Sequence, residues 1–126
     1  ECRVRYTAEE AAPLFAQASA GLAHLHASGF AHRDLKLENM CTTRRGPDAT
    51  VKLVDLGCAA ACGAGEHALT GMWGSPYYVA PEVARWKAWA GEGHAPPPCY
   101  GLEADCWSLG VCLFVMLSAT SPWSDS

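Results

Sequence analysis

Residues 32–39 read His-Arg-Asp-Leu-Lys-Leu-Glu-Asn (HRDLKLEN), a concentration of ionisable side chains in a chain whose residues are 50% hydrophobic. Two short strands are predicted after this stretch, at residues 40–42 and 51–54, with a turn rich in Gly, Pro and Asp between them. A hairpin of these strands would place Asn39 at the start of one strand and Asp55 at the end of the other. The pattern therefore predicts that two metal-competent side chains, distant in sequence, lie close together.

A helix is predicted before this polar stretch. Thr7 and Glu10 have the spacing of a capping box, in which each side chain accepts a hydrogen bond from the backbone N–H of the other residue. The alanine-rich helix that follows should reach about Ser28, and Gly29 suits its C-terminal cap. Its apolar positions recur every three or four residues and form one face: Leu14, Ala18, Leu22 and Leu25.

Two loops and two further helices are expected after the hairpin. Residues 56–74 and 91–101 are rich in glycine and read as loops. Pro81 suits the first turn of a short helix. The last helix, over about residues 103–118, has no polar face and should be buried on all sides. The chain has few other elements to surround it, so we expect the covering elements to lie outside the chain.

Charge and hydropathy exclude several classes of partner. The formal net charge is -4, and no basic run is longer than Arg44-Arg45, so neither nucleic acid nor an anionic membrane surface is expected as a partner. The most apolar run, residues 106–117, is shorter than the roughly 20 residues that a membrane-spanning helix needs. Residues 1–4 do not resemble the start of a signal peptide.

The chain contains seven cysteines, an odd number, and no CxxC pair. This pattern favours reduced thiols in a cytoplasmic or nuclear protein. An alternative is a zinc site made by Cys58, Cys62 and His67, although the paired knuckles typical of such sites are missing.

Four sequence motifs, in order along the chain, resemble those of a protein kinase. Residues 32–39 match the pattern H-R-D-L-x-x-x-N of the kinase catalytic loop. Asp55-Leu56-Gly57 stands where that family has Asp-Phe-Gly, and Ala80-Pro81-Glu82 would close the activation segment. Residues 105–110 resemble the start of the central helix of the large lobe. The chain thus resembles a eukaryotic serine/threonine protein kinase, and residues 74–83 (GSPYYVAPEV) are most similar to the calcium/calmodulin-dependent branch.

The resemblance implies a fold and a function. Residues 1–126 would form the central part of the large lobe, an α+β arrangement that is mostly helical, with a small hairpin carrying the catalytic loop. The small lobe and the last helices would lie outside the chain, so residues 1–126 alone are expected to be inactive and to aggregate. The parent protein would transfer the γ-phosphoryl group of ATP to Ser or Thr hydroxyls of a protein substrate, using Mg²⁺. The alternatives are a pseudokinase or ATP-independent binding module, and an inactive truncated product; a regulatory domain or partner is not identified.

The resemblance also assigns the chemistry to particular residues. Asp34 would be the catalytic base that accepts or orients the substrate hydroxyl, and Lys36 would neutralise the transferring phosphoryl group. Asn39 and Asp55 would bind ATP through Mg²⁺, because their hard oxygens suit that ion. Structural or activation-segment roles are implied for His32, Arg33, Leu56, Gly57, Thr70, Ser75, Glu82 and Asp105.

These supporting roles differ in kind. His32 is expected to pack rather than to catalyse, and Leu56 to fill an apolar slot. Ser75 would hydrogen-bond near Asp34 and Lys36. Asp105 would bind the backbone of the catalytic loop, cap the last helix, or both.

Phosphorylation of the activation segment is a separate expectation. Thr70 is a candidate phosphosite, but it lies one residue further from Gly74 than the usual site, where Gly71 stands. Arg33 can pair with a phosphate on that segment. Glu82 would pair with an arginine outside the chain.

Overall fold

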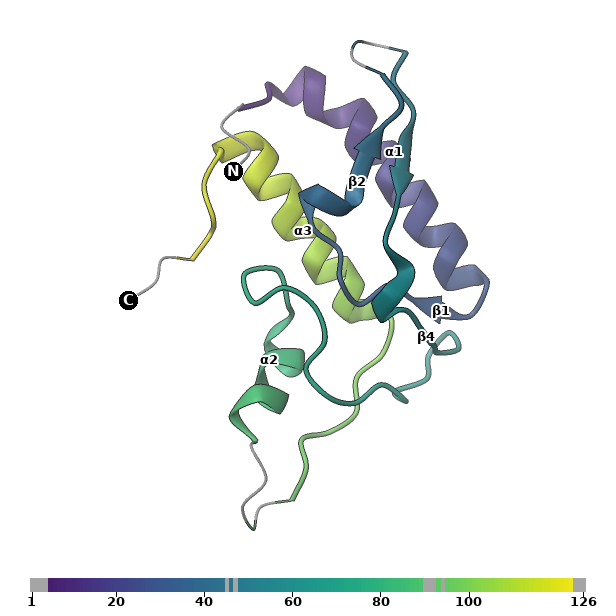
Figure 1. Cartoon of the computed structure of the whole chain (residues 1–126), viewed down its shortest axis with the longest axis vertical. Helices are drawn as coiled ribbons and strands as arrows, with labels where there is room; N and C mark the ends of the chain where they lie inside the picture. The colour runs from purple at the N-terminus through teal and green to yellow at the C-terminus, as the bar shows by residue number, and fades with distance from the viewer. Residues whose placement is uncertain (1–4, 45, 47, 90–92, 94, 124–126) are drawn as a thin grey trace.

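A computed structural model describes residues 5–44, 46, 48–89, 93 and 95–123 of the chain (Figure 1). The chain folds into helices and two small antiparallel sheets, an α+β mixture as the sequence predicts. In chain order the elements are the helix α1 (Ala8–Ala27), the strand β1 (Phe30–Ala31), the 3₁₀ turn η1 (Leu37–Asn39), the strands β2 (Met40–Thr42) and β3 (Val51–Leu53), the 3₁₀ turn η2 (Leu56–Cys58), the strand β4 (Ala60–Ala61), and the helices α2 (Pro81–Ala88) and α3 (Glu103–Ser118).

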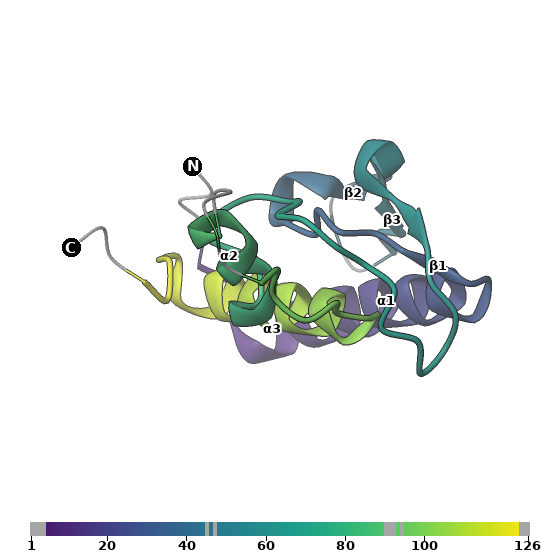
Figure 2. The ribbon, with the colours of Figure 1, turned by 90° about the horizontal axis from the view of Figure 1, so that it is seen from below.

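The helices α1 and α3 lie side by side, and the β2–β3 hairpin lies over α1 (Figures 1 and 2). Ala18 and Leu22 of α1 and Leu109 of α3 bury their side chains in one cluster with Leu35, which belongs to the 32–39 loop. Leu35 is only 1% exposed. The hydrophobic residue in the middle of HRDLKLEN therefore anchors the polar loop to the two long helices.

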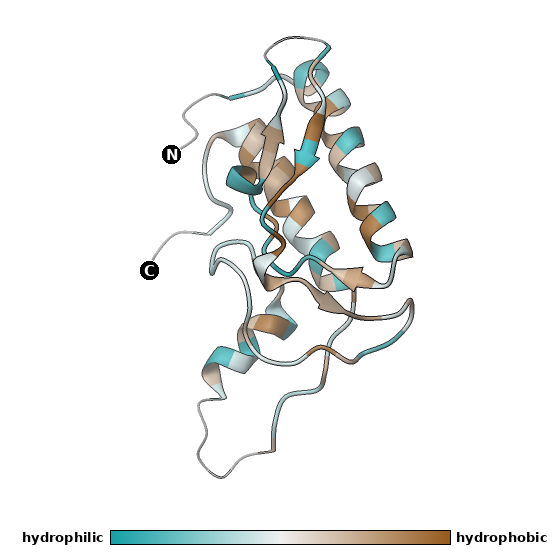
Figure 3. Cartoon of the chain, turned by 45° about the vertical axis from the view of Figure 1, so that its right-hand side comes forward, coloured by the Kyte–Doolittle hydropathy of each residue, from teal (hydrophilic) through white to brown (hydrophobic). Residues whose placement is uncertain are grey.

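Helix α1 begins and ends where the sequence predicts. The Thr7 hydroxyl accepts the Glu10 N–H at 3.3 Å, and the Glu10 carboxylate accepts the Thr7 N–H at 2.9 Å. At the other end Ser28 is the C-cap, and Gly29 follows with φ +82°, a conformation that only glycine adopts freely. Figure 3 shows hydrophilic and hydrophobic residues interspersed along α1. Its buried residues are Ala11, Ala18 and Leu22, of which Ala18 and Leu22 belong to the predicted apolar face.

The predicted hairpin is present. Met40 pairs with Leu53 and Thr42 with Val51, and the Val54 N–H donates to the Asn39 carbonyl at 3.0 Å, just beyond the last strand pair. The second strand ends at Leu53 rather than at the expected Val54. Residues 45 and 47 of the connecting turn lie outside the described residues.

The prediction of a loop throughout residues 56–74 is wrong in part. This stretch contains η2 and β4, and β4 pairs antiparallel with β1, Phe30 opposite Ala61 and Ala31 opposite Ala60. Two-residue strands made mostly of alanine carry no alternation of polar and apolar residues, so the sequence gives no signal for them. The pairing joins the segment after Asp55 to the segment before His32.

The expectation that the chain alone cannot cover α3 on all sides is confirmed for the described residues. Leu109, Cys112 and Met116 are buried, whereas Trp107 is 40% exposed and Phe114 is 46% exposed. Helix α1 packs along α3, whereas α2 meets only the start of α3, in the cluster that contains Val83 and Ala104. The exposed apolar residues leave α3 with one side bare.

A second hydrophobic cluster lies between α2, the start of α3 and the segment before α2. Tyr100 and Leu69 belong to it and pair through their backbones, each N–H donating to the other carbonyl at 3.0 Å. Trp86 of α2 packs against the same cluster and contacts Trp89 edge to face. This cluster fixes residues 69–75 against the rest of the molecule. Residues 90–92 and 94 of the following loop lie outside the described residues.

The cysteines in the described part of the chain are all free, and Cys2 lies outside that part. Burial raises the pKa of the Cys112 thiol to about 12. No group of three or more His, Cys, Asp or Glu side chains that could hold a metal ion occurs among the described residues, so Cys58, Cys62 and His67 form no such cluster. The helices of the described part are all too short or too polar to cross a membrane.

Candidate active site

Three polar side chains from two segments meet in the candidate site. The Ser75 hydroxyl donates to Oδ1 of Asp34 at 2.9 Å, and the Lys36 ammonium donates to the Ser75 oxygen at 3.0 Å. Lys36 Nζ also lies 3.5 Å from Oδ2 of Asp34. Asp34 is 14% exposed and Lys36 27% exposed at their side chains, so both remain accessible to a substrate. The sequence placed Ser75 near these two residues, and the structure brings all three together.

A buried carboxylate holds the backbone of the 32–39 loop. Asp105, at the start of α3, is 2% exposed. It accepts the N–H of His32 at 2.7 Å, the N–H of Arg33 at 2.8 Å and a hydrogen bond from Nε2 of His26 at 2.8 Å. A buried charge is stable only when such donors satisfy it. Of the two roles considered for Asp105, binding the loop backbone is the one for which the structure provides hydrogen bonds, because the N-cap of α3 is Leu102 and makes no side-chain cap.

His32 connects the loop to the hairpin. Its side chain is fully buried. Nδ1 accepts the Asp34 N–H at 3.2 Å, so Nε2 carries the proton and donates to the Val54 carbonyl at 3.1 Å. The ring thus links the carbonyl of Val54, the residue before Asp55, to the backbone N–H of Asp34. It forms no hydrogen bond with the Asp34 carboxylate.

Asn39 and Asp55 lie at the same end of the hairpin. The amide nitrogen of Asn39 donates to the Asp34 carbonyl at 2.8 Å and, more weakly, to Oδ2 of Asp34 at 3.5 Å, while its side-chain oxygen has no hydrogen-bond donor among the described residues. Asp55 is exposed, and one of its carboxylate oxygens, Oδ1, accepts the Gly57 N–H at 3.2 Å. One amide oxygen and one carboxylate are few ligands, but they are the hard oxygens that Mg²⁺ takes from a protein when waters and phosphates supply the rest. The donor set therefore fits a magnesium ion that is shared with a phosphorylated substrate.

Two non-glycine residues of the site have left-handed backbone conformations. Arg33 has φ +65° and Asp55 has φ +61°. Such conformations cost on the order of 1–3 kcal/mol each and persist where surrounding contacts enforce them. Here the enforcing contacts are the hydrogen bond from Arg33 N–H to Asp105 and the one from Gly57 N–H to Asp55.

Three other predicted positions lie outside this constellation. Leu56 is 54% exposed, so the expectation that it fills an apolar slot is wrong here, because η2 lies at the surface. Thr70 is exposed and Glu82 is half-buried. Neither of their side chains forms a hydrogen bond or ion pair with another described residue.

Sequence reasoning missed two contributors. His26, in the last turn of α1, contacts Asp105 across 79 positions of sequence, and Trp73 lies under the Arg33 guanidinium, 4.6 Å from the ring centroid to Cζ. A histidine on a helix and a tryptophan in a glycine-rich loop carry no spacing signal. Only the folded arrangement reveals these contacts.

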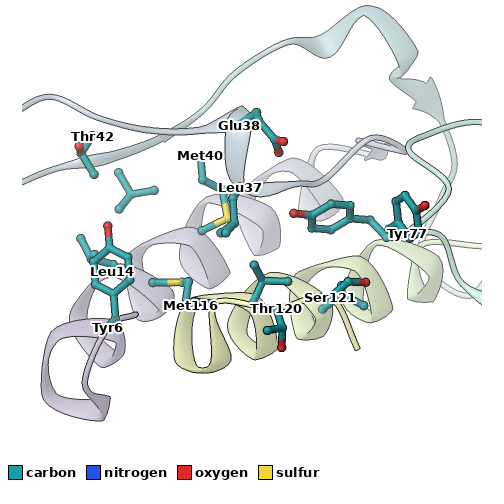
Figure 4. A pocket seen from close by; sticks show the side chains of 15 residues that line it. Tyr6, Leu14, Leu37, Glu38, Met40, Thr42, Tyr77, Met116, Thr120 and Ser121 are labelled. Atoms are coloured by element: carbon teal, nitrogen blue, oxygen red, sulfur yellow. The ribbon is translucent and has the colours of Figure 1, made fainter. Parts of the chain in front are cut away.

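A half-open cavity of about 680 Å³ lies beside the site, between η1, the hairpin and the C-terminal half of α3 (Figure 4). Met40 and Met116 point into it from β2 and α3 (Figure 4). None of Asp34, Lys36 and Asn39 lines it. Leu37 and Glu38, which follow Lys36 in the chain, line the cavity and connect it to the polar constellation. The three polar side chains themselves do not face the cavity.

Comparison with known proteins places this geometry in a family. The model of the protein kinase domain matches residues 2–126. The probable serine/threonine-protein kinase fhkE of Dictyostelium discoideum is 39% identical over 123 residues, which cover 96% of this chain and 16% of that protein. Calcium-dependent protein kinase 26 of Oryza sativa subsp. japonica is 39% identical over 126 residues, 98% of this chain and 21% of that protein.

A third relative, the maternal embryonic leucine zipper kinase of Xenopus laevis, is 38% identical over 122 residues, 96% of this chain and 17% of that protein. The chain therefore spans about a fifth or less of the length of these relatives. Since the family model covers nearly every residue and the relatives are serine/threonine and calcium-dependent kinases, this chain belongs to the protein kinase catalytic domain family.

Proposed function

We propose that the whole protein carrying residues 1–126 is a serine/threonine protein kinase, which transfers the γ-phosphoryl group of ATP to Ser or Thr hydroxyls of a protein substrate. One observation carries the proposal: the Asp34 carboxylate, the Lys36 ammonium and the Ser75 hydroxyl meet in a single hydrogen-bonded group at an accessible surface. In this proposal residues 1–126 are the central part of the large lobe of the kinase domain.

The arrangement suits phosphoryl transfer, in which the protein mainly positions groups and compensates charge. The Asp34 carboxylate accepts the proton of the substrate hydroxyl and orients that hydroxyl for attack. Lys36, 3.5 Å from the carboxylate, presents a positive charge where the negative phosphoryl group passes. Ser75 bridges the two, because its hydroxyl donates to Asp34 and accepts from Lys36.

Magnesium would be held by the side-chain oxygen of Asn39 and by Asp55, and it would neutralise charge on the phosphates. Asn39 also joins the metal position to the base, because its amide nitrogen holds the carbonyl of Asp34. These residues orient the phosphate end of the nucleotide relative to the carboxylate. ATP and a protein substrate are the proposed partners, and a reducing compartment, cytoplasm or nucleus, is the proposed location, which the free cysteines support.

The test of the function is transfer of radiolabelled phosphate from ATP to peptides by the whole protein. We expect labelling of peptides with Ser or Thr acceptors and none of a matched peptide in which Tyr is the acceptor. The reaction should stop when EDTA removes the metal. Nucleotide binding without transfer to any peptide would contradict the proposal and favour a pseudokinase.

The metal role of Asp55 gives a separate prediction. Asp55→Asn keeps the size of the side chain and tolerates the left-handed backbone, but it removes the negative charge. We expect affinity for Mg–ATP to fall roughly 10- to 100-fold, a loss typical when support for a metal site is removed, while affinity for metal-free ATP stays nearly unchanged. Titration of both nucleotide forms by calorimetry measures this.

Asp48→Asn is the matched control for Asp55→Asn. Asp48 is 81% exposed at its side chain and, among the residues that the structure describes, pairs with Arg44 alone, at 3.9 Å, so neither affinity should change. An equal loss for the two nucleotide forms in Asp55→Asn would show that Asp55 acts on the nucleotide or the fold and not through magnesium.

A further inference from the structure

The Arg33 side chain is engaged by neutral groups. Its guanidinium carbon lies 4.6 Å from the centroid of the Trp73 ring, within the range of a cation–π interaction. Its Nε donates to the carbonyl of Cys58, while its backbone N–H is held by Asp105. Arg33 therefore links the 32–39 loop, the turn η2 and the segment around Trp73.

The segment that carries Trp73 is held on its other side by Tyr100. Gly71 has φ +79°, and its carbonyl accepts the Tyr100 hydroxyl at 3.0 Å. Tyr100 is 2% exposed. Burial raises the pKa of the Tyr100 hydroxyl, and the positive charge of Arg33 opposes this rise only in part. The hydroxyl therefore stays protonated and can donate its hydrogen bond. A Cβ atom at Gly71 would lie 3.1 Å from Nε1 of Trp73, so the turn and the indole fit closely together.

The segment then reaches the candidate base. Gly74, directly after Trp73, has φ +103°, and a Cβ atom there would overlap the carbonyl oxygen of Arg33. The next residue is Ser75, whose hydroxyl donates to Asp34. The backbone of residues 73–75 is thus laid directly on the backbone of the loop, and Trp73 is the side chain adjacent to that contact.

We propose that Trp73 is a positioning residue, whose indole face holds Arg33 and so orders residues 71–75 with Ser75 on Asp34, without a phosphate group on the segment. The Arg33 guanidinium, which could otherwise bind a phosphate group, is already stacked on the neutral indole ring of Trp73. Thr70, by contrast, is exposed, and its side chain forms no hydrogen bond or ion pair with the described residues. The kinetic test of this inference rests on the proposed kinase function, whereas its structural test rests on the contacts alone.

The experiment compares Trp73→Leu and Trp73→Phe in the whole protein. Leucine fills space without a π face, whereas phenylalanine keeps one. We expect Trp73→Leu to lower kcat roughly 3- to 30-fold, the value of one cation–π contact, with KM for ATP unchanged because Asn39 and Asp55 are not touched. Trp73→Phe should stay within about threefold of the parent.

Two further variants separate positioning from simple loss of packing. In an Arg33→Met background, Trp73→Leu should cause no further loss, because its partner is already gone. Thr70→Ala, the control on the same segment, should keep the parent kcat. Equal losses in the leucine and phenylalanine variants, additive losses with Arg33→Met, or a loss in Thr70→Ala equal to that of Trp73→Leu would each overturn the inference.

Hydrogen exchange gives a readout that needs no activity. The amides of residues 71–75 should exchange several-fold faster in Trp73→Leu than in the parent and should be restored in Trp73→Phe, with the thermal midpoint of each variant as the check on folding. If the parent transfers no phosphate but these exchange differences appear, the proposed function fails and the positioning role stands. If the parent is active and neither exchange nor kcat responds to Trp73→Leu, the positioning role fails alone.

Discussion

Asp34→Asn in the whole protein is expected to lower kcat roughly 100- to 10,000-fold, the usual contribution of a positioned general base. Asparagine has the same size as aspartate and can still accept the hydrogen bond that Ser75 donates to Oδ1. It cannot take a proton from a hydroxyl. The shorter hydrogen bond from Asn39 to residue 34, 2.8 Å, goes to the backbone carbonyl, and the longer one, 3.5 Å to Oδ2, can be kept if the asparagine presents its amide oxygen there, so the metal end of the site should be largely preserved.

For that reason nucleotide affinity should change little in Asp34→Asn, and the measurement is kcat together with Kd for Mg–ATP. Asp48→Asn makes the same chemical change on the exposed turn between β2 and β3 and should leave both quantities unchanged. Turnover within threefold of the parent in Asp34→Asn would contradict the assignment of Asp34 as base. A parallel collapse of nucleotide affinity would instead show that Asp34 acts in binding.

The parts of the site that sequence could predict are local in the chain or tied to a recognisable motif. The hairpin of residues 40–42 and 51–53 follows from two short apolar runs around a turn, and it brings Asn39 and Asp55 to one end. The Thr7 cap is a four-residue pattern, from Thr7 to Glu10. The hydrogen bonds from Ser75 to Asp34 and from the loop backbone to Asp105 were expected because the motifs resemble those of a family.

The parts that sequence could not predict depend on contacts between distant residues with no periodic pattern. The β1–β4 pair is built largely from alanines, which favour neither partner nor register. His26 and Trp73 acquire their contacts with Asp105 and Arg33 only when α1, α3 and residues 69–75 are packed. The exposed side of α3, by contrast, was expected, because an apolar pattern on every face calls for burial and the chain has few other elements to provide it.

One carboxylate connects these distant parts, and its removal should have the largest effect on stability. Asp105 accepts three hydrogen bonds at 2.7–2.8 Å, two from the N–H groups of His32 and Arg33 and one from His26. Asp105→Ala leaves these donors without a partner in a site that is 2% exposed. Buried donors without partners cost about 1–3 kcal/mol each, and Asp105→Ala would leave the N–H groups of His32 and Arg33 and Nε2 of His26 in that state.

We therefore expect Asp105→Ala to lower the free energy of unfolding of the kinase domain by about 3–5 kcal/mol, from three donors left without a partner, a large share of the roughly 5–15 kcal/mol that holds a domain folded. Thermal unfolding of the whole protein, followed through the transition of the kinase domain, measures this against Asp48→Ala, whose exposed carboxylate should matter by less than about 0.5 kcal/mol. Hydrogen exchange then locates the loss, because the amides of His32 and Arg33 donate directly to the missing carboxylate. Their exchange should accelerate more than that of the α1 amides, which keep their own helical hydrogen bonds. An unchanged midpoint, or a uniform acceleration that spares no element, would mean that Asp105 does not hold the loop, and the left-handed conformation of Arg33 would then need another cause.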